Sequence, residues 1–130
     1  MITENDRNDL VEHRLNQASD TLELAKFLIA NDKLIIAVNR IYYGMYNALT
    51  ALALKKGFET SKHSQLIGWF NREFIMPGTS DPKYGKILRN AFQNRTKGDY
   101  DAFISFSTPE VEIMLSEMSE FLSEVNRLIG

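Results

Sequence analysis

Apolar side chains recur at helical spacing along most of the chain. In the first stretch they step by four and three residues in turn, which places them on one side of a helix. These positions are Val11, Leu15, Ala18, Leu22, Ala25 and Ile29. Similar spacing recurs in four later stretches. None of them shows the alternation of apolar and polar residues that is typical of a strand. The pattern predicts helices over about residues 7–30, 33–56, 62–75, 82–96 and 108–129.

Residues that cap or break helices separate these stretches. Asp32 is expected to cap the second helix, and Gly57 is expected to end it. Pro77-Gly78 predicts a turn, Pro82 predicts the start of the fourth helix, and Lys97-Gly98 predicts its end. Short connections of this kind place neighbouring helices antiparallel. The sequence therefore predicts an all-α fold, an up-and-down antiparallel helical bundle of about five helices.

The charge of the chain is unevenly distributed. A length of 130 residues predicts one domain over residues 1–130, and a formal charge of −2 argues against a general nucleic-acid binder. Residues 55–97, however, carry nine basic and three acidic side chains, a net +6. Residues 1–32 and 98–130 carry −4 and −6. A basic middle between acidic ends indicates a local site for a polyanion.

Several classes of protein are excluded by composition. The chain has no cysteine, which excludes disulfides, thiolate metal sites and a cysteine nucleophile. Its first ten residues are polar, unlike a secretory signal, and no apolar run approaches the ~18 residues of a membrane span. We therefore expect a cytoplasmic protein. The histidines, His13 and His63, are distant in sequence and lack a carboxylate cluster, so we expect no metal and no cofactor.

Three polar residues lie on one face of the otherwise apolar second helix. Arg40, Tyr43 and Asn47 are spaced i, i+3 and i+7. One interpretation is structural: the arginine pairs with a neighbouring carboxylate, and the tyrosine is half-buried with its hydroxyl hydrogen-bonded. The other is functional, because a planar guanidinium in a cleft suits phosphate.

His63 stands at the start of the third predicted helix, beside Lys62. A histidine at this position could contact an anion or act as a general acid or base near neutral pH. The alternative is a solvated residue at the end of a helix.

The segment from residue 88 to residue 101 has the densest set of polar side chains. Arg89 and Gln93 share a face of the fourth helix, and Asp99 can reach back to Arg95. Asn94 and Tyr100 belong to the same segment. A structural ion pair that fixes the following loop explains these residues as well as a binding site does.

Two further sets are assigned to the core and to the solvent. Trp69, Phe70 and Phe74 are expected in the core rather than as a platform for stacking bases. The acidic face of the last helix is expected to be solvated, and its members are Glu110, Glu117, Glu120 and Glu124.

Together these residues resemble the pattern of HEPN-domain proteins. The stretch from Asn39 to Ala48, NRIYYGMYNA, is similar to the R-x-Y-Y-x-M-[FY]-x-A helix of that family. The later motifs follow in the order found in one prokaryotic subfamily: Ser61-Lys62-His63-Ser64, Phe70 and Phe74, and then Arg89, Arg95, Asp99 and Tyr100. The resemblance covers about residues 10–128.

The resemblance implies a helical bundle that forms a homodimer and works in RNA-directed defence or in a toxin–antitoxin system. Members are often encoded beside a minimal nucleotidyltransferase, which is the partner implied here. Many are metal-independent endoribonucleases with an R-x4–6-H motif, in which histidine transfers protons and arginine stabilises charge on the phosphate. In this chain Arg89 begins the motif, but Asn94 stands at the histidine position and cannot exchange a proton near pH 7.

Two functions follow from the resemblance and the departure. The first is an RNA- or nucleotide-binding protein whose candidate contacts are Arg40, Tyr43, Asn47, Lys62, Asn94, Asp99 and Tyr100. The second is a metal-independent endoribonuclease toxin whose candidate catalytic residues are His63, Arg89 and Arg95. That enzyme requires folding to bring His63 to the arginines. A third alternative is a structural dimer that only covers the surface of a partner.

Overall fold

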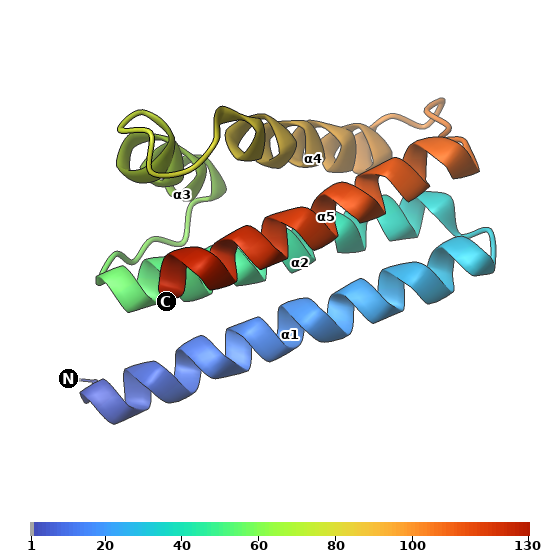
Figure 1. Ribbon diagram of the computed structural model, residues 1–130. Helices are drawn as coiled ribbons and strands as arrows, with labels where there is room; N and C mark the ends of the chain where they lie inside the picture. Colours follow the sequence, from blue (N-terminus) through green and yellow to red (C-terminus); the bar gives the residue numbers. More distant parts are fainter. Residues whose placement is uncertain (1) are drawn as a thin grey trace.

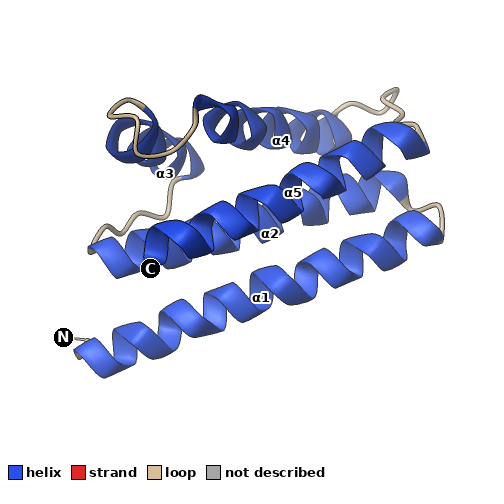
Figure 2. Ribbon diagram, in the orientation of Figure 1, coloured by secondary structure: helices blue, strands red, loops and turns tan. Residues whose placement is uncertain are grey.

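The computed structural model describes residues 2–130, and in that range it contains helices and no strand (Figure 2). The helices are α1 (Glu4–Ala30), α2 (Leu34–Lys56), α3 (His63–Phe70), the π-helical turn η1 (Asn71–Ile75), α4 (Pro82–Tyr100) and α5 (Thr108–Ile129). The predicted all-α class and the five helices are confirmed. No helix in the described range has both the length and the apolar character needed to cross a membrane.

Helix α2 lies at the centre of the bundle. It packs against α1, α4 and α5, and α1 forms the most extensive of these interfaces (Figure 1). The short α3 and η1 lie across one end of the bundle, before α4 returns along α2. The largest fully buried side chains include Tyr42 and Met45 of α2, Phe70 of α3 and Phe121 of α5. Trp69, Phe70 and Phe74 lie in the core, as predicted.

The turn between α1 and α2 differs from the prediction. Asp32 does not cap α2; it has a φ of +59° and belongs to the end of α1. Its N–H donates to the Ile29 carbonyl, and the N–H of Lys33 donates to the Leu28 carbonyl. This is the hydrogen-bond pattern of a Schellman motif, which satisfies carbonyls left free at a helix end. Lys33 takes the capping position of α2 without a side-chain hydrogen bond.

Helix α4 continues beyond its predicted end at Lys97-Gly98. The glycine stays helical and lies between two side chains: a Cβ placed on it would be 3.6 Å from Ile35 Cγ2 and 3.6 Å from Phe106 Cε2. Packing against α2 and the following loop therefore supports one more turn, which the glycine alone disfavours. The extension ends at Tyr100, so Asp99 and Tyr100 are helical rather than part of a loop.

The acidic face of α5 is only partly solvated. Glu124 is buried at 6% exposure, contrary to the expectation from its neighbours on that face. Its carboxylate accepts two hydrogen bonds from Arg127, at 2.6 and 2.7 Å, and one from the buried Ser80 hydroxyl. Arg127 also donates to the Thr79 carbonyl at 3.0 Å. This group of contacts ties the loop before α4 to α5.

Candidate functional site

Two consecutive turns of α2 supply three tyrosines to one region of the molecule. Tyr42 is fully buried, whereas Tyr43 and Tyr46 are half-buried. The rings of Tyr42 and Tyr43 meet edge to face, with centroids 5.4 Å apart. Adjacent residues on a helix diverge by about 100°, so this pair spans the boundary between the core and the surface.

His63, the first residue of α3, packs into this group of tyrosines. Its Nδ1 lies 2.6 Å from the Tyr42 hydroxyl, and its ring stacks on Tyr46 with centroids 4.1 Å apart. Burial lowers the pKa of His63, and the charge of Arg95 lowers it further. Burial, with Tyr46 adding to it, raises the pKa of Tyr42, so its hydroxyl keeps its proton. A neutral imidazole that accepts from Tyr42 at Nδ1 carries its own proton on Nε2, and we expect this tautomer.

This arrangement predicts a fixed tautomer for His63. Nitrogen NMR of the wild-type protein at pH 7.5 should show the proton on Nε2, with a titration midpoint below the ordinary ~6.5. The Tyr42→Phe variant removes the donor, so both tautomers should be populated and the free energy of unfolding should fall by about 1 kcal/mol. The exposed His13 provides an internal reference in the same spectra. A wild-type proton on Nδ1 would contradict the assignment.

Arg95 approaches the tyrosines from α4. Its Nη2 donates to the Tyr43 hydroxyl at 2.6 Å, and its guanidinium carbon lies 5.1 Å from the centroid of the Tyr43 ring. The Arg95 side chain is only 17% exposed, and its Nε lies 3.0 Å from Asp99 Oδ2. That contact has the distance of an ion pair without the direction of a hydrogen bond. Burial and contact with aromatic rings suit the weakly hydrated guanidinium.

Arg40 reaches the same ring from α2. Its guanidinium carbon lies 5.2 Å from the Tyr43 centroid, and its Nε and Nη2 donate to Asn39 Oδ1 at 3.0 and 2.5 Å. Asn39 in turn donates to both carboxylate oxygens of Asp99, at 3.2 Å each. Among residues 2–130, no Asp or Glu forms an ion pair with Arg40.

These contacts define what we call the polar cluster. It consists of Asn39, Arg40, Tyr42, Tyr43, Tyr46, His63, Arg95 and Asp99. It contains two guanidinium groups and only one carboxylate, so it carries a net positive charge beside half-buried aromatic rings. Within the described part of the chain, no three His, Asp or Glu side chains are grouped so as to hold a metal ion.

The structure brings together five of the residues singled out from the sequence: Arg40, Tyr43, His63, Arg95 and Asp99. Two more lie next to them in the chain. Asn47 is half-buried one turn beyond Tyr43, and the exposed Lys62 precedes His63.

The remaining three candidates do not join the polar cluster. Arg89 is exposed on another side of α4, because six residues separate it from Arg95. Tyr100 is 79% exposed at the end of the helix.

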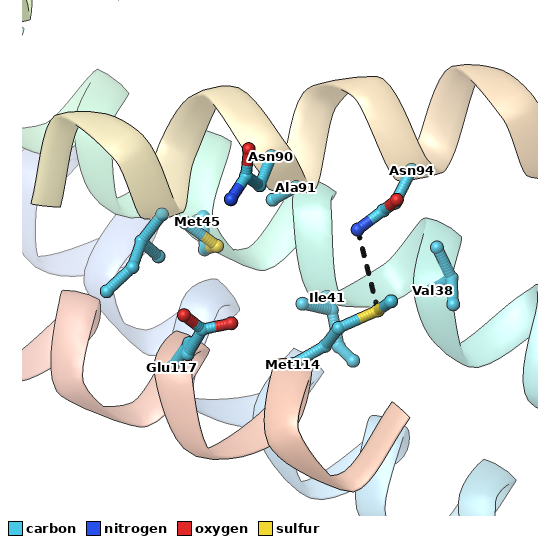
Figure 3. Close-up of a pocket in the computed structure, with 9 residues that line it drawn as sticks. Val38, Ile41, Met45, Asn90, Ala91, Asn94, Met114 and Glu117 are labelled. Carbon is cyan, nitrogen blue, oxygen red and sulfur yellow. Dashed lines mark hydrogen bonds between the residues drawn. The ribbon is translucent and has the colours of Figure 1, made fainter. Parts of the chain in front are cut away.

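Asn94, at the position of the motif histidine, points towards α5, where its Nδ2 lies 3.9 Å from Met114 Sδ (Figure 3). The cavity beside it is about 20 Å³, which is room for about one water molecule.

The sequence did not single out three members of the polar cluster: Asn39, Tyr42 and Tyr46. Tyr42 and Tyr46 repeat at i and i+4 beside Tyr43, a spacing that places three hydroxyl groups on adjoining faces of one helix. That repetition is the available signal. It does not reveal the partner, since His63 is 21 residues from Tyr42.

Comparison with known proteins shows the family. The model of the family described as HEPN domain matches residues 11–128. A "UPF0332 protein" of Thermotoga maritima is 35% identical over 125 residues, which cover 96% of this chain and 95% of the relative. Two proteins of Methanocaldococcus jannaschii, named "Putative toxin MJ0142" and "Putative toxin MJ0605", are 30% and 27% identical. The matches cover 92% and 95% of this chain, and 81% and 92% of those relatives.

Proposed function

The chain belongs to the HEPN domain family, and we propose that it binds RNA or nucleotides through the polar cluster as part of a toxin–antitoxin or defence system. The observation that carries the proposal is the pair of guanidinium groups, Arg40 and Arg95, held against the ring of Tyr43. Two relatives bear the name toxin, which supports the biological setting. Within the proposal the chain works as a homodimer with a nucleotidyltransferase as its partner.

The chemistry of the polar cluster suits a nucleotide. A guanidinium offers a planar set of N–H donors that matches phosphate oxygens, and its plane can stack on an aromatic base. Arg40 makes its hydrogen bonds to a neutral amide, so its charge is available to an anion. The net charge of +6 over residues 55–97 would draw a polyanion towards α3 and α4.

Binding of a fluorescent single-stranded RNA in EDTA, measured by anisotropy, tests the proposal. Arg95→Gln and Arg40→Gln should each weaken binding by about tenfold or more, because a hydrogen bond to a charged group is worth about 1.5–3 kcal/mol. Lys97→Gln is the matched control: it removes one positive charge from an exposed position of the same helix as Arg95. That control should change the affinity by less than about threefold.

Equal losses of RNA affinity in Arg95→Gln, Arg40→Gln and Lys97→Gln would mean that general charge attraction, not the polar cluster, holds the RNA. No binding by the wild-type protein would remove the proposal. Circular dichroism and thermal unfolding of each variant separate lost contacts from lost folding, because Arg95 also contacts Tyr43 and Asp99.

A metal-independent endoribonuclease is the second candidate, and the nearness of His63 to Arg95 favours it. In the Nε2–H tautomer that we expect, however, the Tyr42 hydroxyl faces Nδ1, the nitrogen on which the imidazole would accept a proton. This geometry supports binding over catalysis. The same RNA incubated in EDTA with the wild-type protein and with His63→Ala and Arg95→Ala decides between them. Cleavage lost in both variants would replace the binding proposal with the enzyme, and intact RNA at every protein concentration would exclude the enzyme.

A further inference from the structure

A groove lies between α4 and α5, because these two helices share a smaller interface with each other than either shares with α2. Its volume is about 400 Å³, within the size range of small-molecule sites, ~300–1,000 Å³. Asn90 and Asn94 reach into it from α4, and Met114 and Glu117 reach into it from α5 (Figure 3). The next residue of α4, Arg95, donates to Tyr43 instead, so the groove is separate from the polar cluster.

The polar side chains of the groove have hydrogen-bonding capacity that the fold does not use. Within residues 2–130, Asn90 and Glu117 form no side-chain hydrogen bond, and Asn94 contacts only the sulfur of Met114, a weak acceptor. Burial raises the pKa of Glu117. Ile113, which is 62% exposed, and Met114 add apolar walls. Apolar walls with a few convergent polar groups are the usual composition of a ligand site.

We propose that the groove between α4 and α5 binds a guanine base of the RNA. The inference rests on the proposed function for the presence of RNA, and it adds the base that is recognised. The Watson–Crick edge of guanine carries two parallel donors, N1–H and N2–H, which match the two oxygens of the Glu117 carboxylate. Its O6 and N7 atoms are acceptors, which the side-chain amide groups of Asn90 and Asn94 can donate to.

Other ligands match this set of side chains less well. Adenine presents an acceptor, N1, to the Glu117 carboxylate, and uracil presents only one donor, N3–H. The guanidinium of an arginine from a partner protein has donors alone, so it would leave the amide N–H groups of Asn90 and Asn94 without an acceptor. Guanine supplies both the paired donors and the acceptors.

Three uridine-rich RNAs that differ at one central position, which holds guanosine, inosine or adenosine, test the proposal by anisotropy in EDTA. Inosine lacks only the N2 amino group of guanosine. The wild type should therefore bind the guanosine RNA about tenfold more tightly than either of the others, because a site built to accept that N–H rejects a ligand without it.

Glu117→Gln should change which base is preferred. A glutamine amide has one acceptor and one donor, which pair with adenine rather than with the two donors of guanine. The affinity for the guanosine RNA should fall about tenfold, and the adenosine RNA should bind at least as tightly as the guanosine RNA. Glu112→Gln is the matched control: it removes the same charge from an exposed position of α5 outside the groove. It should keep the preference for guanosine.

Two results would overturn the inference and leave the proposed function standing. One is equal affinity of the wild type for the guanosine and inosine RNAs. The other is an effect that does not distinguish the two variants, either because Glu117→Gln keeps the preference for guanosine or because Glu112→Gln also loses it. The Glu117 carboxylate would then not recognise the base.

Nuclear magnetic resonance with free guanosine tests the groove without the polar cluster, since a nucleoside has no phosphate. Guanosine should shift the side-chain amide signals of Asn90 and Asn94 in the wild type and in Arg95→Gln, but not in Glu117→Gln. If the wild type binds no RNA, the proposed function fails and these shifts decide the inference: their presence supports it and their absence overturns it. Larger shifts with N-acetylarginine amide than with guanosine would also overturn it, because the groove would then fit an arginine of a partner protein.

Discussion

Replacing Gly44 by valine is expected to lower the free energy of unfolding by about 3 kcal/mol, because this position has no room for a branched side chain. Gly44 lies in the middle of α2, where α1 and α5 both approach it. A Cβ placed there would be 2.2 Å from Met118 Cε and 3.2 Å from Thr21 Cγ2. The end of a methionine side chain can move, but the γ carbons of valine would also push against α1.

Gly68 provides the matched control for this prediction. It is exposed in α3, with no atom within 4 Å of a Cβ placed on it. Gly68→Val should be neutral or slightly stabilising, since glycine is the poorer helix former. Urea denaturation of both variants measures the difference. Equal stability of Gly44→Val and Gly68→Val would show that the helices separate without cost and that the close approach at Gly44 is unimportant.

Replacing Glu124 by alanine is expected to lower the free energy of unfolding by about 2 kcal/mol at pH 7. The buried Ser80 hydroxyl would lose its acceptor, and an unpaired buried polar group costs about 1–3 kcal/mol. Glu120→Ala is the control on the same helix: its contact with Lys83 is 3.9 Å long and exposed. An exposed pair of this kind contributes less than about 1 kcal/mol. Equal losses in the two variants would contradict the structural role of Glu124.

The contribution of Glu124 should also depend on pH. The hydrogen bonds from Arg127 lower the pKa of Glu124, burial opposes them, and the Ser80 hydroxyl lowers it further. A carboxyl group whose pKa is lower in the folded chain stabilises the fold above its unfolded pKa, about 4.3, and loses that effect as pH falls through the folded pKa. The difference in stability between the wild type and Glu124→Gln should therefore shrink below about pH 4. A difference unchanged down to about pH 2 would contradict the lowered pKa.

The helices were predictable because burial of one apolar face decides where they form. The period of Val11, Leu15 and Ala18 marks the face of α1 towards α2 without any knowledge of α2. Two boundaries were not predictable. The backbone N–H of Asp32 donates to a carbonyl at the end of α1 instead of Asp32 capping α2. The helical turn at Gly98 depends on contacts with Ile35 and Phe106, which are distant in sequence.

The polar cluster was predictable where a polar residue interrupts an apolar pattern and, for His63, Arg95 and Asp99, where polar residues gather near the end of a predicted helix. Arg40 and Tyr43 interrupt the apolar pattern, whereas Tyr42 matches the pattern of a core residue and is one. Its hydrogen bond to His63 depends on how α3 crosses α2, and nothing within either segment encodes that crossing locally. Glu124 illustrates the same limit: it repeats with solvated glutamates, but its partner Ser80 is 44 residues away.

The central position of α2 restricts how sequences with this fold can diverge. The helix packs against neighbours on most of its circumference. A substitution of Tyr42 that favours a different ligand therefore also alters the packing of the bundle. Helix α4 is under weaker constraint: it contributes Arg95 and Asp99 to the polar cluster but buries only three of its residues. Change of ligand during evolution should therefore proceed through α4, while the tyrosines of α2 are retained as a fixed platform.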